Sequence, residues 1–108
     1  KIFSYKKQKI EEKKYTKWFD YDKIKNSPCV RTRRQGDYLT VNSEGGRKKL
    51  NRIFIDEKIP AEMRDRLPVV AVGSEILWIP GGRMNEKYKI TSTTGRVLEL
   101  HYQGGALA

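Results

Sequence analysis

The amino-acid sequence predicts an α+β fold, made mainly of antiparallel β-sheet in a layered, sandwich-like arrangement with one or two short helices. Short runs rich in Val, Ile and aromatic residues alternate with turn signals, which is typical of strands. A single i, i+3, i+4 apolar pattern adds a helix. The 108 residues suffice for one core, and 2 Trp, 6 Tyr and 3 Phe argue against disorder. We therefore expect one domain over residues 1–103 and a disordered tail over residues 104–108.

The N-terminal segment predicts short extended pieces. Lys1–Ile10 is compatible with a strand, and Ile10–Lys17 is polar enough for a turn or a fraying helix. Tyr15–Tyr21 is aromatic and extended, and we expect its Trp18 to pack in the core rather than to stack on a ligand. A break at residues 26–28 separates this part from the next strand.

The middle of the chain predicts a strand, a turn and a second strand. Val30–Arg33 has strand composition, Gly36-Asp37 supplies a turn, and Tyr38–Val41 follows as the possible partner strand. Asn42–Gly46 is a loop by composition.

One amphipathic helix is predicted from Arg47 to Glu57. Its apolar face consists of Leu50, Ile53 and Phe54. Its opposite face presents Lys48, Lys49 and Arg52. Pro60 closes this helix, and Ala61–Arg66 gives a second short helical turn.

Two hairpins are predicted in the C-terminal half. Val69–Val72 and Glu75–Ile79 flank Gly73-Ser74, which suits a type II′ turn, and their apolar residues on both faces indicate the interior of a sheet or sandwich. The second hairpin joins Tyr88–Thr91 to Arg96–Tyr102, whose alternating apolar and polar residues indicate one buried face.

The positive charge is concentrated in the first part of the chain. The formal net charge is +10; residues 1–60 hold 17 Lys and Arg against eight Asp and Glu, and residues 61–108 hold six against five. A field of this sign attracts polyanions such as nucleic acid, and a basic face that only keeps the protein soluble is the alternative. We expect the first part to face outward and the second to build the core.

Catalytic and metal chemistry finds little support. The chain has one Cys, Cys29, and one His, His101, so structural zinc is excluded and no internal disulfide can form. We interpret Cys29 as an unreactive small hydrophobe and His101 as a surface residue. No apolar run approaches the ~18 residues of a membrane span. A reducing compartment such as the cytoplasm is the expected location.

Two segments suit phosphate. Gly45-Gly46 precedes the predicted basic helix, whose N-terminal amides can hold a phosphate, although the Walker spacing is missing. Arg31 and Arg33 share one face of the predicted strand, about 7 Å apart, and match successive phosphates. Alternatively, Asp37 ties one of these Arg side chains back through an ion pair; both roles are compatible.

Five short motifs follow one another along the chain. They are Arg31-x-Arg33-x-x-Gly36-Asp37, Gly46-Arg47-Lys48-Lys49-Leu50, Asp56-x-Lys58-Ile59-Pro60, Arg64 with Pro68, and Trp78-x-Pro80-Gly81-x-Arg83. This series resembles the C-terminal domain of tRNA(Ile)-lysidine synthetase, and the stretch Tyr15–Asp20 extends the resemblance to essentially the whole chain. Each motif is unspecific by itself, but their order and spacing together are specific.

The resemblance implies a non-catalytic tRNA-binding module of a longer enzyme. The family uses ATP to adenylate the wobble cytidine of a minor isoleucine tRNA and then attaches lysine, in an N-terminal domain whose loop is missing here. ATP with Mg and lysine are thus expected for the full-length enzyme, and no cofactor for this domain. The resemblance places the domain on the tRNA acceptor stem and relates its fold to a domain of the phenylalanyl-tRNA synthetase β subunit.

The candidate tRNA contacts combine the motif positions with the basic cluster of the middle segment. They are Arg31, Arg33, Arg34, Lys48, Lys49, Arg52, Lys58, Arg64 and Arg83. Lys58 or Arg64 could instead pair with Asp56 or Asp65. The expected partners are the isoleucine tRNA and other domains of the same polypeptide, with no membrane contact; the sequence leaves the oligomeric state open. Two other functions remain: a generic basic nucleic-acid-binding domain, and a structural domain that packs on an acidic partner.

Overall fold

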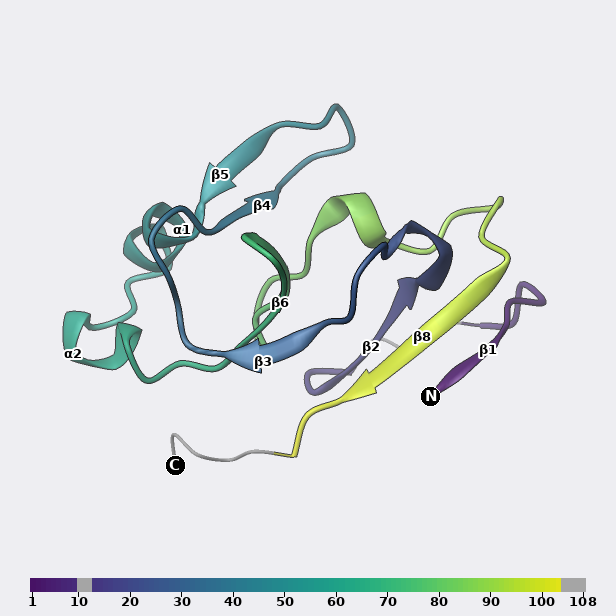
Figure 1. The fold of residues 1–108 in the computed structure, drawn as a ribbon, viewed down its shortest axis with the longest axis horizontal. Coiled ribbons are helices and arrows are strands. Elements are labelled where there is room, and N and C mark those ends of the chain that lie inside the picture. Colours follow the sequence, from purple (N-terminus) through teal and green to yellow (C-terminus); the bar gives the residue numbers. More distant parts are fainter. Residues whose placement is uncertain (10–12, 104–108) are drawn as a thin grey trace.

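The protein, a computed structural model that describes residues 1–9 and 13–103, consists of two β-sheets and short helices (Figure 1). The smaller sheet is antiparallel, with the strand order β1-β8-β2. Its strands are β1 (Ile2–Ser4), β8 (Arg96–His101) and β2 (Thr16–Asp20). Strand β8 thus joins the two ends of the chain, pairing with β1 on one side and β2 on the other.

The larger sheet has five strands in the order β3-β6-β7-β4-β5. These are β3 (Cys29–Arg31), β6 (Val69–Val72), β7 (Glu75–Trp78), β4 (Tyr38–Thr40) and β5 (Arg47–Lys49). All neighbours are antiparallel except β4 and β7. The helices are α1 (Leu50–Asp56), α2 (Ala61–Arg64) and the 3₁₀ turns η1 (Tyr21–Lys23) and η2 (Glu86–Tyr88).

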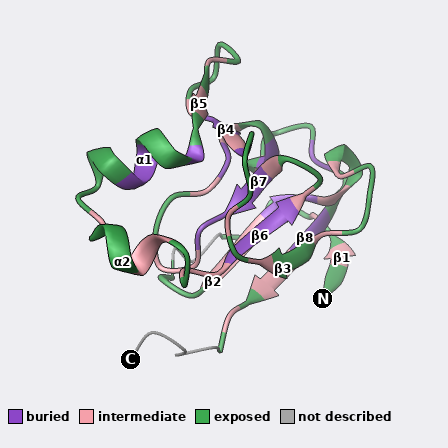
Figure 2. Cartoon of the chain, turned by 60° about the vertical axis from the view of Figure 1, so that its left-hand side comes forward, coloured by how far each residue is buried: buried purple, intermediate pink, exposed green. Residues whose placement is uncertain are grey.

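The larger sheet is the middle layer of the domain. On one face, Leu50, Ile53 and Phe54 of α1 pack against the sheet in a buried cluster that includes Ile76. A second cluster joins Phe19 and Leu98 of the smaller sheet to residues of β6 and β7. Figure 2 shows β6 and β7 buried at the centre, while α1 turns exposed residues outward. The predicted α+β class, with mainly antiparallel layered sheets and two short helices, is confirmed.

The hairpin of β6 and β7 is confirmed as predicted from the apolar runs around Gly73-Ser74. Gly73 has φ +62°, and Ser74 is not among the non-glycine residues with positive φ, as a type II′ turn requires. Both strands are buried almost throughout. The extended stretch at Thr16–Asp20 is also confirmed. The strand at Arg96–His101 forms as predicted, but its burial does not alternate, because the adjacent Val97 and Leu98 are both buried.

The predicted pairing of the strand at residues 30–33 with that at 38–41 is wrong. Strand β3 pairs with β6, and β4 pairs with β5 and β7. The apolar hairpin of β6 and β7 occupies the centre of the larger sheet, because its residues are buried on both faces. Strand β3 therefore pairs with β6 on one side of the hairpin, and β4 pairs with β7 on the other.

The helix begins later than its predicted start at Arg47. Residues 47–49 form β5, with Lys49 opposite Tyr38 and Arg47 opposite Thr40, and α1 begins at Leu50. The loop at residues 42–46 closes this hairpin, because Asn42 Oδ1 accepts hydrogen bonds from the backbone N–H groups of Glu44 and Gly46. Lys48 and Lys49 therefore lie on a strand and not on a helix face.

The predicted pairing of Tyr88–Thr91 with Arg96–Tyr102 is also wrong. Tyr88 is the last residue of η2, and β8 pairs instead with β1 and β2. The buried Asn85 fixes η2: its side chain accepts from the N–H of Lys87 and donates to the carbonyl of Ile76. A local side-chain cap thus replaces the expected strand.

The chain ends were predicted only in part. The N-terminal strand is limited to Ile2–Ser4, and Ile10 lies outside the described residues, as does the predicted tail at residues 104–108. Of the predicted turn or helix at residues 10–17, the described part contains a turn at Lys14 and Tyr15, closed by the Lys13–Thr16 bridge, and β2 begins at Thr16. Searched over residues 1–9 and 13–103, the helices include none long and apolar enough to cross a membrane.

The division into an outward first part and a core-building second part is only partly right. The buried core draws on both, since Phe19, Leu39 and Phe54 are 0–1% exposed. Trp78 is buried as expected, whereas Trp18 is half-buried and packs edge-on against Phe3, with ring centroids 4.9 Å apart.

Candidate nucleic-acid interface

Arg31 is tied to Asp37 inside the protein. Its guanidinium donates to both carboxylate oxygens, at 2.9 and 2.8 Å, and the two side chains are only 9% and 2% exposed. The hydrogen bond with Asp37 raises the pKa of Arg31. Arg31 also donates to the carbonyl of Gly73 at 2.7 Å. The alternative in which Asp37 forms an ion pair with one of the two Arg side chains is therefore confirmed. Arg31 connects the β3–β4 loop, through Asp37, to the β6–β7 turn, through Gly73.

Asp37 also shapes the loop that carries the next two basic residues. Its carboxylate accepts a third hydrogen bond, at 2.7 Å, from the backbone N–H of Arg34. Gly36 has φ +90°, a left-handed conformation that favours glycine. This turn leaves the Arg34 side chain exposed.

Arg33 connects this loop to both helices. Its Nε donates to Asp65, after α2, at 2.8 Å, and one terminal nitrogen donates to Asn51 of α1 at 2.9 Å. The two Arg side chains that were expected to bind successive phosphates thus differ: Arg31 is buried in an ion pair, and Arg33 lies at the surface beside α1.

A second group of basic residues surrounds Asp56 at the end of α1. Lys48 of β5 and Arg52 of α1 both pair with its carboxylate. The hydrogen bond from Lys48 is the main cause that lowers the pKa of Asp56, and Arg52 and Arg83 lower it further through their charges. The loop with Arg83 lies near this end of α1, because a Cβ on Gly82 would lie 3.9 Å from Glu57 Oε1.

The connection between α1 and α2 carries two more candidates. Lys58 is exposed and has φ +58°, which is unusual for a lysine. Arg64 is half-buried, and its Nε donates to the carbonyl of Ile59 at 2.9 Å. Neither pairs with Asp56 or Asp65, whose partners are Lys48, Arg52 and Arg33.

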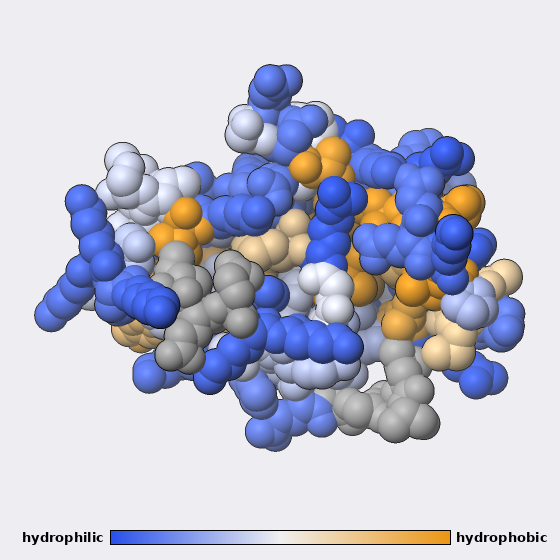
Figure 3. Space-filling model, turned by 180° about the vertical axis from the view of Figure 1, so that it is seen from behind, coloured by the Kyte–Doolittle hydropathy of each residue, from blue (hydrophilic) through white to orange (hydrophobic). Residues whose placement is uncertain are grey.

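Eight of the nine candidates therefore lie on α1 or on segments next to it, and we call them the α1 basic surface. It comprises Arg33, Arg34, Lys48, Lys49, Arg52, Lys58, Arg64 and Arg83. Within residues 1–9 and 13–103, the side chains of Arg34, Lys49 and Lys58 form no hydrogen bond or ion pair. Figure 3, seen from behind, shows hydrophilic residues at the β4–β5 hairpin at the top and hydrophobic patches between hydrophilic residues on the right.

The expected phosphate site at Gly45-Gly46 does not have the predicted geometry. These glycines lead into β5 rather than into the first turn of a helix, and α1 begins four residues after Gly46 with Lys49 as its N-cap. No helix N-terminus is therefore placed beside the glycines.

Sequence reasoning missed the polar partners that orient the basic residues. Asn51 and Asp65 hold Arg33, and Asp56 holds Lys48 and Arg52. Arg47, which was not among the candidates, is exposed on the edge strand β5 and lies over the ring of Tyr38, 4.7 Å from its centroid. No local pattern marks the partners of Arg33 and Lys48, because they come from other elements, whereas the i, i+4 spacing of Arg52 and Asp56 within α1 could have indicated that pair.

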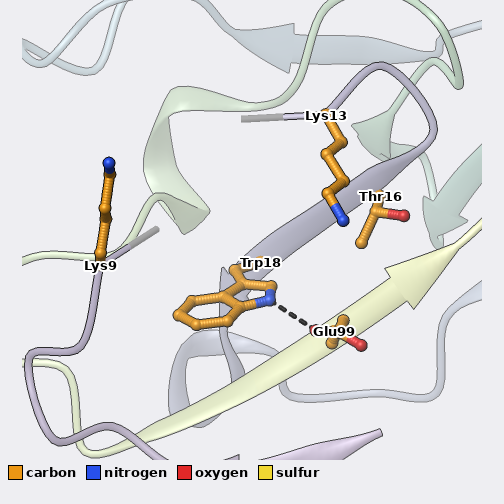
Figure 4. A pocket seen from close by; sticks show the side chains of 5 residues that line it. All are labelled: Lys9, Lys13, Thr16, Trp18 and Glu99. Atoms are coloured by element: carbon orange, nitrogen blue, oxygen red, sulfur yellow. Dashed lines mark hydrogen bonds between the residues drawn. The ribbon is translucent and has the colours of Figure 1, made fainter. Parts of the chain in front are cut away.

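A separate polar cavity lies beside the smaller sheet. It has a volume of about 230 Å³ and is lined by Lys9, Lys13, Thr16, Trp18 and Glu99 (Figure 4). The indole N–H of Trp18 donates to Glu99 at 2.7 Å. The carboxylate of Glu99 offsets one of the two lysine charges at this cavity.

The single Cys and the single His of the sequence are both exposed. Cys29 is exposed rather than packed as a small hydrophobe, and the exposed His101 lies beside the Thr16 hydroxyl. Over the part of the chain that the structure describes, no three His, Cys, Asp or Glu side chains gather in a way that could hold a metal ion.

Comparisons with known proteins agree on one family. The model of the family described as "TilS substrate C-terminal domain" matches residues 29–100. The tRNA(Ile)-lysidine synthase of Caldanaerobacter subterraneus subsp. tengcongensis is 50% identical over 88 residues, which are 82% of this chain and 19% of that protein. The enzyme of the same name from Clostridium tetani is 41% identical over 90 residues, 83% of this chain and 19% of that protein.

A solved structure extends the agreement to the fold. "Crystal structure of TILS C-terminal domain" matches with a TM-score of 0.72 and 33% identity, over 94% of this chain and 82% of that one. The chain spans about a fifth of the length of the curated relatives it matches. With a family model that matches most of the chain and a relative of the same fold, this protein belongs to the family of TilS substrate C-terminal domains.

Proposed function

We propose that this domain binds the acceptor stem of an isoleucine tRNA as a non-catalytic part of a tRNA(Ile)-lysidine synthetase. The observation that carries the proposal is the α1 basic surface, in which Arg34, Lys49 and Lys58 form no hydrogen bond or ion pair among the described residues. The names of the relatives give the tRNA its identity.

Recognition of a duplex stem depends on phosphates and shape. The major groove of A-form RNA is too deep and narrow for side chains, so phosphates, 2′-hydroxyls and the wide minor groove remain. Arg33 and Arg52 present guanidinium groups at the surface, and Arg forms bidentate contacts with phosphate. Arg31 acts in this proposal by fixing the loop, because its donors are used within the protein.

The whole enzyme supplies the chemistry. In the proposal, ATP with Mg and lysine bind elsewhere in the longer polypeptide, which modifies the wobble cytidine in the cytoplasm while this domain holds the stem.

A binding titration tests the proposal. About five to seven phosphate contacts make log affinity fall with log salt with a slope of several units. We expect this slope with an isoleucine acceptor minihelix, together with weaker binding of an unrelated duplex of equal length. Equal affinity for both duplexes would indicate a generic nucleic-acid-binding domain, and a flat salt dependence would refute RNA binding.

Charge reversal on the α1 basic surface separates RNA binding from protein packing. Lys49→Glu and Lys58→Glu each remove one exposed, unpaired charge, so we expect lower affinity and a salt slope smaller by about one unit for each. Lys6→Glu is the matched control, since this exposed lysine follows β1, at the other end of the molecule from α1 (Figure 1). If the two variants bind RNA normally but fail to associate with the rest of the polypeptide, the domain packs on an acidic partner instead.

A further inference from the structure

An apolar cavity lies between the edge strand β3 and the end of β8, outside the α1 basic surface. It has a volume of about 130 Å³. Its walls include Cys29 and Val30 of β3, Val70, Trp78, and on the other side His101 and Tyr102. It therefore opens where the packing between the two sheets ends.

One wall of this cavity is a row of side chains across three strands. Val30 lies opposite Val70, and Val70 lies opposite Trp78, so the three residues share one face of the larger sheet. Val70 and Trp78 belong to the core between the sheets, whereas Val30 at the outer end is 61% exposed. The row thus runs from the core to an uncovered apolar rim.

Trp78, one of the walls of this cavity, has a buried indole N–H that no hydrogen bond within residues 1–9 and 13–103 uses. The residue is 1% exposed, and its indole N–H has no hydrogen-bond partner among the described residues. A buried N–H without an acceptor is unfavourable, because the hydrogen bond to water that it loses is not replaced. An acceptor atom that reaches this N–H would replace that bond.

A polar cavity adjoins the apolar one at Pro28, which lines both. It has a volume of about 380 Å³ and is lined by Tyr21, Ile24, Lys25, Asn26 and Ser27 besides Pro28. The Lys25 ammonium donates one hydrogen bond to the carbonyl of Asp22 at 3.0 Å and keeps its charge for an anion. The nearby Asp22 carboxylate is paired with Arg96, which reduces its repulsion of such an anion.

We propose that the two cavities bind one nucleotide of a single-stranded RNA segment, with the base in the apolar cavity and the phosphate beside Lys25. A nucleobase is flat, carries acceptor atoms for the Trp78 N–H, and stacks on aromatic rings such as Tyr102. An apolar peptide side chain has no such acceptor and gains nothing from Lys25. Bases within an A-form duplex stay stacked, so the ligand is an unpaired end. This inference rests on the proposed function, to which it adds a site that reads the end of the RNA.

Cys29 permits a direct test with the unaltered chain. It is the single cysteine of the sequence, it is exposed, and it lines the apolar cavity. We would measure its rate of alkylation by iodoacetamide alone, with a blunt acceptor minihelix, and with the same minihelix carrying a short single-stranded 3′ overhang. We expect the overhang to slow alkylation of Cys29 about tenfold or more and the blunt duplex to leave the rate unchanged. Stacking of one base raises affinity about tenfold or more, so an RNA concentration that saturates the site with the overhang leaves it largely empty with the blunt duplex.

Two variants locate the effect. Val30→Glu places a negative charge on the exposed rim, and we expect it to abolish the preference for the overhang. Ile2→Glu is the matched control. Ile2 is 50% exposed on β1 and does not line the cavity, so this substitution adds the same negative charge away from it. Trp78→Phe keeps an aromatic ring and deletes the N–H, so we expect a weaker preference for the overhang. If this core variant does not fold, the result with Val30→Glu decides whether the cavity binds the overhang.

The outcomes separate this inference from the proposed function. If both minihelices bind with equal affinity and Cys29 reacts at one rate throughout, RNA binding stands and the nucleotide site is refuted. If neither minihelix binds, the proposed function fails as well. If mononucleotides protect Cys29 as well as the overhang does, the site takes free nucleotides and not an RNA end. If Cys29 is already protected in a longer polypeptide without RNA, another part of the protein covers the cavity and the inference is overturned.

Discussion

Replacing Asp37 by Asn tests whether the Arg31–Asp37 pair holds the loop that leads to the α1 basic surface. Asp37 accepts three hydrogen bonds: two from the Arg31 guanidinium, at 2.9 and 2.8 Å, and one from the N–H of Arg34, at 2.7 Å. Both side chains of the pair are nearly buried, at 9% and 2% exposure. Asp37→Asn removes the charge and offers an N–H where one guanidinium N–H needs an acceptor.

The magnitude follows from the burial of the pair. Removing one partner of a buried ion pair costs about 3–5 kcal/mol. Arg31 keeps its hydrogen bonds to the carbonyls of Thr32 and Gly73, so we take the lower end of that range, about 3 kcal/mol. With a urea dependence of about 1.5 kcal/mol per molar, the unfolding midpoint falls by roughly 2 M.

Urea unfolding followed by tryptophan fluorescence measures this change, and Asp65→Asn is the matched control. Asp65 also pairs with an Arg of the same loop, Arg33, but its side chain is 78% exposed, so we expect a loss of about 0–1 kcal/mol. Equal midpoints for the two variants would refute the reasoning. In that case Arg31 would behave as a surface arginine, free to bind phosphate.

Three further predictions concern charge, titration and packing. Asp56→Asn frees Lys48 and Arg52, so we expect tighter binding of the acceptor minihelix at low salt and a steeper salt slope; an unchanged slope would contradict the assignment of these residues. Burial, together with the hydrogen bond to Glu75, raises the pKa of Tyr88. The phenol therefore stays protonated when the pH passes the ordinary tyrosine pKa of about 10. Its contribution to the free energy of unfolding is complete below that pH and is lost as the pH rises toward the higher pKa of the folded state. Tyr88→Phe should therefore leave the phenolate absorbance near that pH unchanged. Phe54→Ala empties a core position that is 1% exposed, and we expect a loss of about 3–5 kcal/mol in the same urea assay.

The local patterns were sufficient where an element depends on its own residues. The β6–β7 hairpin follows from two apolar runs and a glycine with φ +62°, and the apolar face of α1 follows from the spacing of Leu50, Ile53 and Phe54. In both cases the turn or the periodicity lies within one short segment, so the chemistry of that segment decides its structure.

The pairing of the other strands depended on residues far apart in the sequence. Strand β3 pairs with β6, whose paired residues lie about forty positions further along the chain, and β8, near the C-terminus, pairs with β1 and β2, near the N-terminus. The expected partner of β3 was the next strand along the chain, which is a reasonable local choice. The larger apolar surface of β6 and β7 overrode it, because burial of that hairpin on both faces requires strands on either side and layers above and below.

The sequence by itself determined the family, the mixed α+β class and the excess of positive charge that predicts a polyanionic partner. Only the tertiary structure decided how the nine basic candidates differ. Arg31 and Arg33 are two residues apart, yet one is buried against Asp37 and the other lies at the surface between α1 and α2. Charge is a property of each residue, whereas its availability to a ligand depends on which carboxylates and carbonyls the fold brings within hydrogen-bonding distance.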